Sequence, residues 1–200
     1  IFGQKLSKDE LYAIIQDTVK GTLTEVEIAG FLLAQQFYGM TDEEQVWLTK
    51  AMADTGERID FEKPVYDKHS VGGVPGNKVS LLVIPIVSSA GLLIPKTSSR
   101  AITSPSGTAD TMSVLAPVDF SGTELKQVAL KAGGAIAWGG SLHLAPADDI
   151  LIGVEHPLRI DPEPQMVASI MAKKLAVGAD FMVLDLPVGH EAKIESSQEG

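Results

Sequence analysis

The spacing of hydrophobic and polar positions changes near residue 60. Residues 7–56 contain three successive runs of apolar side chains at helical spacing, and a Ser/Thr-x-x-Glu capping box precedes each run. The boxes begin at Ser7, Thr24 and Thr41. We therefore predict a small helical layer of amphipathic helices in this part of the chain.

From Phe61 onward, short β-rich runs alternate with helical runs. Extended segments are predicted at Val65, 92–96, 135–138 and 181–186, and helices near 78–90, 123–132 and 163–176. Such alternation favours a parallel sheet with helices packed on it. The predicted fold class is α/β, with a helical layer over residues 1–60 and a partial α/β domain with a mostly parallel (mixed) sheet over residues 61–200.

The composition narrows the classes of partner. A net charge of −10 argues against nucleic acid or an anionic membrane as a partner, because binding a polyanion needs a basic face. The absence of cysteine excludes disulfides and thiolate chemistry within this chain, and the four scattered histidines disfavour a zinc site. The first residues lack a signal-peptide pattern, and the apolar stretch 79–95 is too short and interrupted to span a membrane. We expect a cytoplasmic protein.

Residues 96–110 have the composition of an anion site. They contain seven hydroxyl side chains, one lysine and one arginine, directly after an apolar run that ends at Pro95. A phosphate needs many short donors converging from one side, and hydroxyls, backbone amides and a guanidinium supply them where a strand gives way to a loop. The alternative interpretation is a surface turn rich in Ser and Thr.

A second donor-rich loop lies at residues 67–80. Three glycines at 72, 73 and 76 follow the extended run at Val65, and an apolar helix is predicted after them. Glycines let backbone amides face a ligand without obstruction from a Cβ atom, although many such loops use glycine only to turn. The pattern is neither a Walker A loop nor a dinucleotide-binding fingerprint.

Together, Lys68-His-Ser-Val-Gly-Gly and the run from Ser98 to Asp110 resemble the signature of the thymidine and pyrimidine-nucleoside phosphorylase family, and most closely its archaeal AMP phosphorylase branch. The resemblance covers the chain from about Ser7 onward and implies the class II nucleoside phosphorylase type of fold. Archaeal relatives are longer, so the chain resembles a central fragment. Two positions depart from the pattern. Ser113 stands where a structural glutamate is usual, and Gly153 lies near the place of a base-contacting arginine.

The reaction implied by this resemblance is phosphorolysis of a nucleoside 5′-monophosphate. AMP and phosphate would give adenine and ribose 1,5-bisphosphate with inversion at C1′, and no metal or organic cofactor is needed. The residues that match the family's ligands for the attacking phosphate are Lys68, Ser70, Ser80, Ser98 and Thr108. From the residues alone, Lys68 could also be a solvated surface lysine.

The resemblance also implies a set of AMP contacts in which added hydroxyls hold the 5′-phosphate. These residues are Gly73, Ser99, Arg100, Ala101, Ile102, Thr103, Ser104, Thr108, Ser169 and Lys193. A bidentate Arg100 would add charge-assisted hydrogen bonds to that phosphate, whereas the alternative is a purely structural arginine.

The resemblance assigns Asp161 as the proton donor to the leaving base. From the pattern alone, Asp-Pro before a predicted helix is an N-cap signal. Ser169 and Lys173 are at i and i+4 on that helix, so they face the same direction and both could contact the base. The alternative for Lys173 is an interaction with the helix dipole. His69 is a weaker candidate for a base contact.

Two other functions fit the pattern. One is a nucleoside phosphorylase or a phosphoribosyltransferase, since anthranilate phosphoribosyltransferase is similar in fold but lacks the serine-rich signature. The other is a non-catalytic fragment that binds phosphate. In each case the expected partners are small molecules, neither nucleic acid nor membrane, and resemblance to relatives that dimerise through a helical layer implies a homo-oligomer, a dimer or larger.

Overall fold

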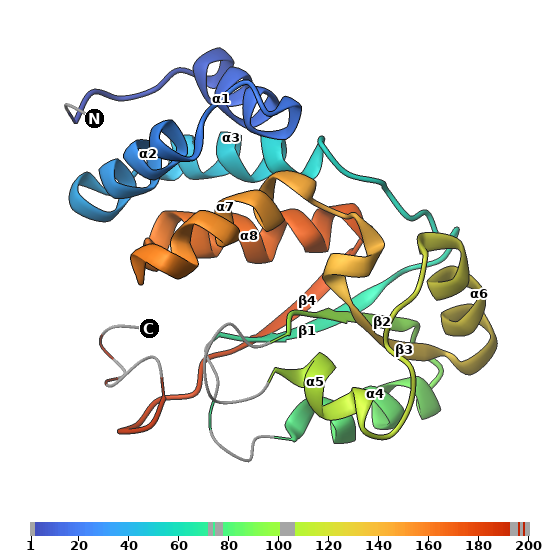
Figure 1. Ribbon diagram of the computed structural model, residues 1–200. Coiled ribbons are helices and arrows are strands. Elements are labelled where there is room, and N and C mark those ends of the chain that lie inside the picture. The colour runs from blue at the N-terminus through green and yellow to red at the C-terminus, as the bar shows by residue number, and fades with distance from the viewer. Residues whose placement is uncertain are drawn as a thin grey trace. The chain divides into compact units, whose positions relative to one another are not determined.

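The computed structural model describes residues 3–71, 74, 78–100, 107–192, 196 and 198. The chain forms two compact units, each built from two stretches of sequence (Figure 1). Unit 1 comprises Ile1–Arg58 and His143–Ala176, and unit 2 comprises Ile59–Leu142 and Val177–Gly200. The first stretch of unit 1 ends beside the boundary predicted near residue 60, and a later stretch then returns to the same unit.

Unit 1 begins with the three predicted helices, α1 (Lys8–Lys20), α2 (Glu25–Tyr38) and α3 (Asp42–Ala53). The three predicted capping boxes are confirmed, because each Ser or Thr side chain accepts a hydrogen bond from the backbone of the Glu three residues later. Each Glu side chain in turn accepts from the N-cap backbone, so every box satisfies two backbone donors that have no partner inside the helix.

Two further helices complete unit 1, α7 (Pro146–Leu158) and α8 (Glu163–Ala176). Apolar residues from all five helices form one core, which includes Leu32, Leu48 and Leu151. The chain re-enters the unit in close contact with Gly56, where an added Cβ would lie 2.0 Å from the Leu144 carbonyl oxygen. Only glycine fits at this approach of two backbone segments.

Unit 2 contains the predicted parallel strands, β1 (Tyr66–Ser70), β2 (Ile94–Ser98), β3 (Gly134–Trp138) and β4 (Phe181–Asp185). β1 pairs with β4 and β2 pairs with β3, both in parallel. An isolated parallel bridge between Val65 and Leu93 links the two pairs. The prediction of an α/β fold with a parallel sheet is therefore confirmed.

Helices α4 (Val79–Ser89), α5 (Thr108–Ser113) and α6 (Gly122–Ala132) connect the strands, and a 3-10 helix, η1 (Gly139–Leu142), follows β3. Ile84 of α4 packs with Ile94 of β2 and Ile136 of β3, and Met112 of α5 packs against the same cluster. This cluster holds α4 and α5 against β2 and β3. In chain order, α4 follows the carboxyl end of β1 and α5 follows that of β2.

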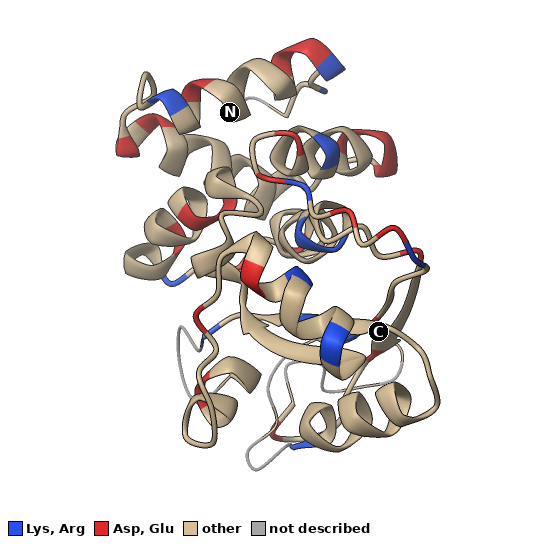
Figure 2. Cartoon of the chain, turned by 90° about the vertical axis from the view of Figure 1, so that its right-hand side faces the viewer, with Lys and Arg blue, Asp and Glu red and all other residues tan. Residues whose placement is uncertain are grey.

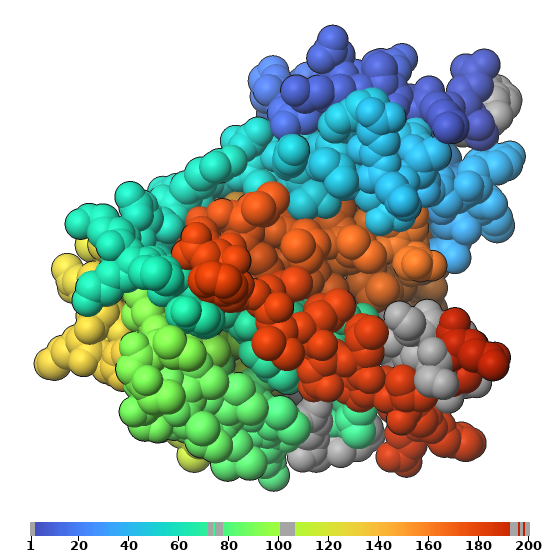
Figure 3. Space-filling model, turned by 180° about the vertical axis from the view of Figure 1, so that it is seen from behind, coloured from blue at the N-terminus to red at the C-terminus, as the bar shows by residue number. Residues whose placement is uncertain are grey.

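The surface is acidic and in places apolar. In the view of Figure 2, lysines and arginines are scattered singly among acidic residues. Apolar side chains of the edge strand β4, including Phe181 and Val183, are exposed, and this segment lies at the surface in Figure 3. Of the helices that the structure describes, none combines the length and the apolar character needed to cross a membrane.

Candidate functional site

The predicted phosphate residue Lys68 is the buried member of a polar cluster on two neighbouring strands of unit 2. Its side chain is only 7% exposed. The ammonium donates to Ser70 Oγ on the same strand, and its Nζ lies 3.0 Å from Asp185 Oδ2 on β4. Ser70 Oγ also donates to Asp185 Oδ2 at 2.8 Å. Lys68 is thus no solvated surface lysine, and the structure brings two predicted phosphate ligands into direct contact.

Asp185 is the negatively charged member of this cluster. The hydrogen bond from Lys68 holds the pKa of Asp185 below its ordinary value, and the bond from Ser70 and the Lys68 charge act in the same direction, against partial burial. The carboxylate therefore stays ionised beside the ammonium. In the parallel register, Ser70 lies opposite Asp185 at the carboxyl ends of both strands.

The other predicted phosphate ligands are at the end of a strand or in the first turn of the helix that follows one. Ser98 is the last residue of β2, Ser80 is a buried residue in the first turn of α4, and Thr108 begins α5. In open parallel sheets the carboxyl edge is where ligands bind. Several predicted AMP contacts lie outside the described residues, namely Gly73, Ala101, Ile102, Thr103, Ser104 and Lys193.

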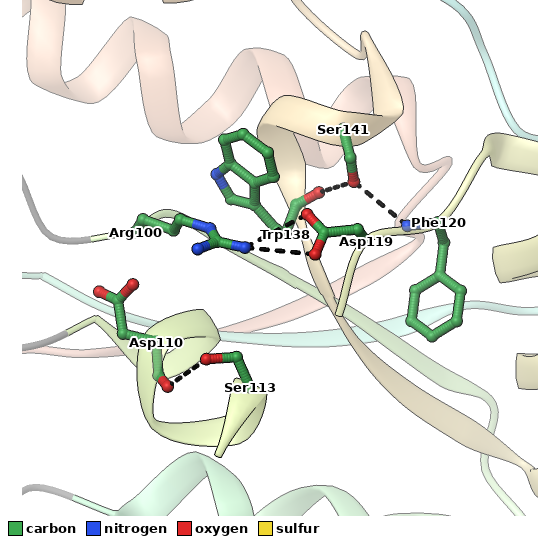
Figure 4. Close-up of polar contacts among 7 residues, drawn as sticks. All are labelled: Arg100, Asp110, Ser113, Asp119, Phe120, Trp138 and Ser141. Carbon is green, nitrogen blue, oxygen red and sulfur yellow. Dashed lines mark hydrogen bonds and ion pairs between the residues drawn. The ribbon is translucent and has the colours of Figure 1, made fainter. Parts of the chain in front are cut away.

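Arg100, predicted for the 5′-phosphate, is held by two side chains of unit 2. Its Nη2 lies 3.2 and 3.3 Å from the two carboxylate oxygens of Asp119, and its guanidinium carbon lies 4.6 Å from the centre of the Trp138 ring (Figure 4). Stacking on an aromatic face and pairing with a carboxylate fix the plane of a guanidinium. Ser99, beside it, is exposed and directly follows the last residue of β2.

The segment that carries Asp119 is fastened to η1. Ser141 Oγ accepts a hydrogen bond from the Phe120 backbone at 3.3 Å and donates to the Trp138 carbonyl at 2.9 Å (Figure 4). On the other side of the close-up, Ser113 donates to the Asp110 carbonyl at 2.7 Å within α5. The hydroxyl of Ser113 thus closes its own helix, and the expectation that this departure affects packing more than chemistry stays a prediction.

In unit 1, the structure brings Ser169 and Lys173 together on one face of α8. Both donate to the same oxygen, Oδ2 of Asp148 in the first turn of α7, with Ser169 Oγ at 2.8 Å. Asp148 is fully buried, whereas the Lys173 side chain is 16% exposed. Next to this pair, desolvation raises the pKa of Asp149, the Lys173 charge opposes that rise and the Asp148 charge adds to it.

The structure describes three further candidates. Asp161 is exposed and lies two residues before α8, and its role as a cap or as a proton donor stays a prediction. His69 follows Lys68 on β1 and is half-buried. Gly153 is on α7, and an added Cβ there would meet nothing within 4 Å, so a larger side chain fits this position.

Sequence reasoning missed three carboxylates, Asp119, Asp148 and Asp185. Each one pairs with a predicted cation from a different segment of the chain. Their partners are 19, 25 and 117 residues away in sequence. The only local signal was an unexplained aspartate in an otherwise apolar or turn-forming stretch. Among the described residues, no group of three or more His, Cys, Asp or Glu is arranged to hold a metal ion.

Two family models match the chain. One describes the helical bundle domain of a glycosyl transferase family and matches residues 1–56, and the other describes the a/b domain and matches residues 62–199. The matches meet close to residue 60, where the spacing of hydrophobic positions changes.

Curated relatives carry the name AMP phosphorylase. The chain is 56% identical to that of Methanocella arvoryzae over 98% of this chain and 39% of the relative. It is 57% identical to AMP phosphorylase 1 of Archaeoglobus fulgidus over 99% of this chain and 40% of the relative. It is 58% identical to the AMP phosphorylase of Methanosarcina acetivorans over 96% of this chain and 38% of the relative. The chain therefore spans about two fifths of the length of these relatives.

A solved structure shares the fold. Anthranilate phosphoribosyltransferase from Thermus thermophilus superimposes with a TM-score of 0.76 at 22% identity, over 92% of this chain and 56% of that one. At this identity the likeness concerns the fold alone, and it agrees with the fold relation that the sequence indicates.

Proposed function

Because this chain belongs to that glycosyl transferase family, we propose that the whole protein catalyses phosphorolysis of AMP, with adenine and ribose 1,5-bisphosphate as products. The observation that carries the proposal is the contact of buried Lys68 with Ser70 at the carboxyl end of a parallel strand, in a chain 56% identical to an AMP phosphorylase. A buried ammonium beside a hydroxyl is suited to hold an oxyanion. The alternative of a thymidine or pyrimidine nucleoside phosphorylase has no comparable support.

In the proposed reaction, Lys68, Ser70, Ser80, Ser98 and Thr108 hold inorganic phosphate. A phosphate oxygen attacks C1′, the bond from C1′ to the base nitrogen breaks, and its electron pair stays on the base. Asp161 donates the proton that the base needs as it leaves, because an unprotonated purine anion is a poor leaving group. The 5′-phosphate of AMP is bound by Arg100 with Gly73 and the segment from Ser99 to Ser104.

The remaining contacts are proposed at the base and at the ribose phosphate. Ser169 and Lys173 contact the base, Lys193 completes the AMP site, and His69 is a weaker candidate at the base. We further propose that the protein acts in the cytoplasm as a homo-oligomer on small molecules, in keeping with a net charge of −10 that is unfavourable for binding polyanions.

The test is release of free base from AMP, adenosine and thymidine by the whole protein, with and without phosphate. We expect phosphate-dependent release from AMP, and a loss of at least about 100-fold in kcat/KM in Lys68→Gln and Asp161→Asn. Lys63→Gln is the matched control, since Lys63 is an exposed lysine five residues from Lys68. Release from thymidine but not from AMP would overturn the nucleotide substrate, and full activity in Lys68→Gln would overturn the phosphate site.

A further inference from the structure

Asp148 is a fully buried carboxylate that touches both predicted base contacts. Its Oδ2 accepts hydrogen bonds from Ser169 Oγ at 2.8 Å and from Lys173 Nζ. The two donors are one helical turn apart on α8, so both side chains reach the same oxygen from one face. The carboxylate and the two donors come from different helices of one compact unit.

The position of Asp148 in its own helix does not explain this arrangement. An acid in the first turn commonly accepts from free backbone N–H groups of the helix end. The N-cap of α7, Ala145, makes no side-chain cap, yet Asp148 directs Oδ2 to α8. Its other oxygen, Oδ1, is buried without a hydrogen-bond partner in the part of the chain that the structure describes.

Stability does not explain the arrangement either. Burying a carboxylate with one oxygen unpaired costs free energy, and replacing a buried ion pair by apolar residues of similar volume is often neutral or stabilising. A buried charge that a fold could do without is a candidate for a role in binding or catalysis.

The carboxylate fixes the hydrogen-bonding direction of its two partners. A serine hydroxyl has a single hydrogen, and a carboxylate can only accept, so the Ser169 hydrogen is committed to Asp148. Ser169 Oγ therefore presents lone pairs and acts as an acceptor toward a ligand. Lys173 has three N–H donors, of which one is committed to Asp148, so it acts as a donor.

We propose that Asp148 is a positioning residue that makes α8 present an acceptor at Ser169 beside a donor at Lys173, and so selects a base with an N–H donor next to a ring acceptor. Adenine has this pattern in its exocyclic amine and the neighbouring ring nitrogen. Purine without the amine offers only the acceptor. The proposal rests on the proposed contact of Ser169 and Lys173 with the base.

The test compares binding of AMP and of purine riboside 5′-monophosphate, which lacks the amine, to the whole protein by calorimetry in the absence of phosphate, so that no turnover occurs. We expect wild type to bind AMP at least about tenfold more tightly, because the analogue leaves the Ser169 acceptor unpaired. In Asp148→Asn the ratio of the two Kd values should fall to within about threefold of one, since an amide can donate to Ser169 Oγ and reverse its polarity.

Two further variants separate positioning from stability. Ser169→Ala removes the acceptor without a buried charge and should lower the ratio as Asp148→Asn does. Glu155→Gln neutralises another buried acid of α7 and should leave the ratio unchanged. An Asp148→Asn protein that weakens both ligands by the same factor, or a Ser169→Ala protein with the wild-type ratio, would overturn the proposal.

Turnover distinguishes this inference from the proposed function. If wild type binds AMP with the expected ratio but releases no adenine when phosphate is added, the proposed reaction fails and the role of Asp148 stands. If wild type turns over AMP but binds both nucleotides equally, the role of Asp148 fails and the reaction stands. If AMP does not bind at all, both are wrong.

Discussion

Each unit contains one cluster of a Lys, an Asp and a Ser. The lysine is the more buried member of the ion pair in unit 2, and the aspartate is the more buried member in unit 1. In unit 2 the Lys68 side chain is 7% exposed and that of Asp185 is 35% exposed. In unit 1 Asp148 is fully buried and the Lys173 side chain is 16% exposed. The first cluster buries a cation and leaves its counter-ion near solvent, whereas the second buries an anion.

The difference matters because the buried charge is the one that cannot be solvated when its partner is lost. Removing one member of a buried pair destabilises a protein mainly through the charge that is left behind. In each cluster, we therefore expect the substitution of the more exposed partner to cost more stability than the substitution of the buried one. This asymmetry can be tested in both units.

The largest effect is expected for Lys173→Met. It leaves the Asp148 carboxylate fully buried without its cation and should lower the free energy of unfolding by about 3–5 kcal/mol. Chemical denaturation of the whole protein at pH 7 measures it. Asp148→Asn should cost less, because the remaining ammonium can reach solvent. Lys50→Met, at an exposed site on α3, should stay within about 0.5 kcal/mol of wild type. A larger cost for Asp148→Asn than for Lys173→Met would contradict the comparison.

A smaller effect is expected for Asp185→Ala in unit 2. It removes a charge-assisted hydrogen bond from buried Lys68 and should cost about 1.5–3 kcal/mol in the same assay. The paired substitution, Lys68→Met, should cost less, since the remaining Asp185 is 35% exposed and can be hydrated. Equal costs for the two variants would show that burial does not decide which partner matters.

The pH dependence of the unfolding free energy tests the contribution of Asp185 separately. The pKa of Asp185 is lowered in the folded protein, chiefly by its hydrogen bond from Lys68. Its contribution is thus fully present above the unfolded pKa, which is about 3.9, and is lost as the pH falls through the lower folded value. The difference in unfolding free energy between wild type and Asp185→Asn should therefore shrink between about pH 5 and pH 3. A difference that grows on acidification would contradict the role of Asp185.

The smallest effect is expected at the exposed pair of Arg100 and Asp119. Both side chains are open to solvent, so Asp119→Asn should change the unfolding free energy by about 1 kcal/mol or less. Its consequence should be seen in binding instead, as a weaker Kd for AMP when the orientation of Arg100 is lost. An Asp119→Asn protein that is strongly destabilised but binds AMP normally would assign Asp119 a structural role.

Much of the fold could be predicted from short-range patterns. The capping boxes at Ser7, Thr24 and Thr41 mark helix starts, and alternation of β-rich and helical runs gives the four parallel strands. Helix α7 was not predicted, because Ala145 gives no capping signal and Pro157 interrupts the helical pattern. Its return to the first three helices depends on long-range packing, which local periodicity does not encode.

In the candidate site, too, some residues could be predicted from local patterns and others depend on long-range packing. The glycine and hydroxyl patterns indicated two donor-rich loops, the family resemblance assigned Lys68 and Ser70 to phosphate, and helical spacing paired Ser169 with Lys173. The carboxylates that hold them were not predictable, since they come from elements distant in the sequence and have no motif of their own. What a local pattern can indicate is the set of donors, whereas the acceptors that orient them are known only once the elements meet.

The pairing of β1 with β4 has a consequence for synthesis of the protein. Lys68 and Asp185 are 117 residues apart, and at 5–20 residues per second a ribosome needs on the order of ten seconds to proceed from one to the other. During that interval the nascent chain carries the Lys68 ammonium without its carboxylate and the β1 edge without its neighbour. An unpaired strand edge is a site of mispairing between chains. Because β2 and β3 are much closer in the sequence, the order of translation leaves the β1 edge without its partner for longer than the β2 edge.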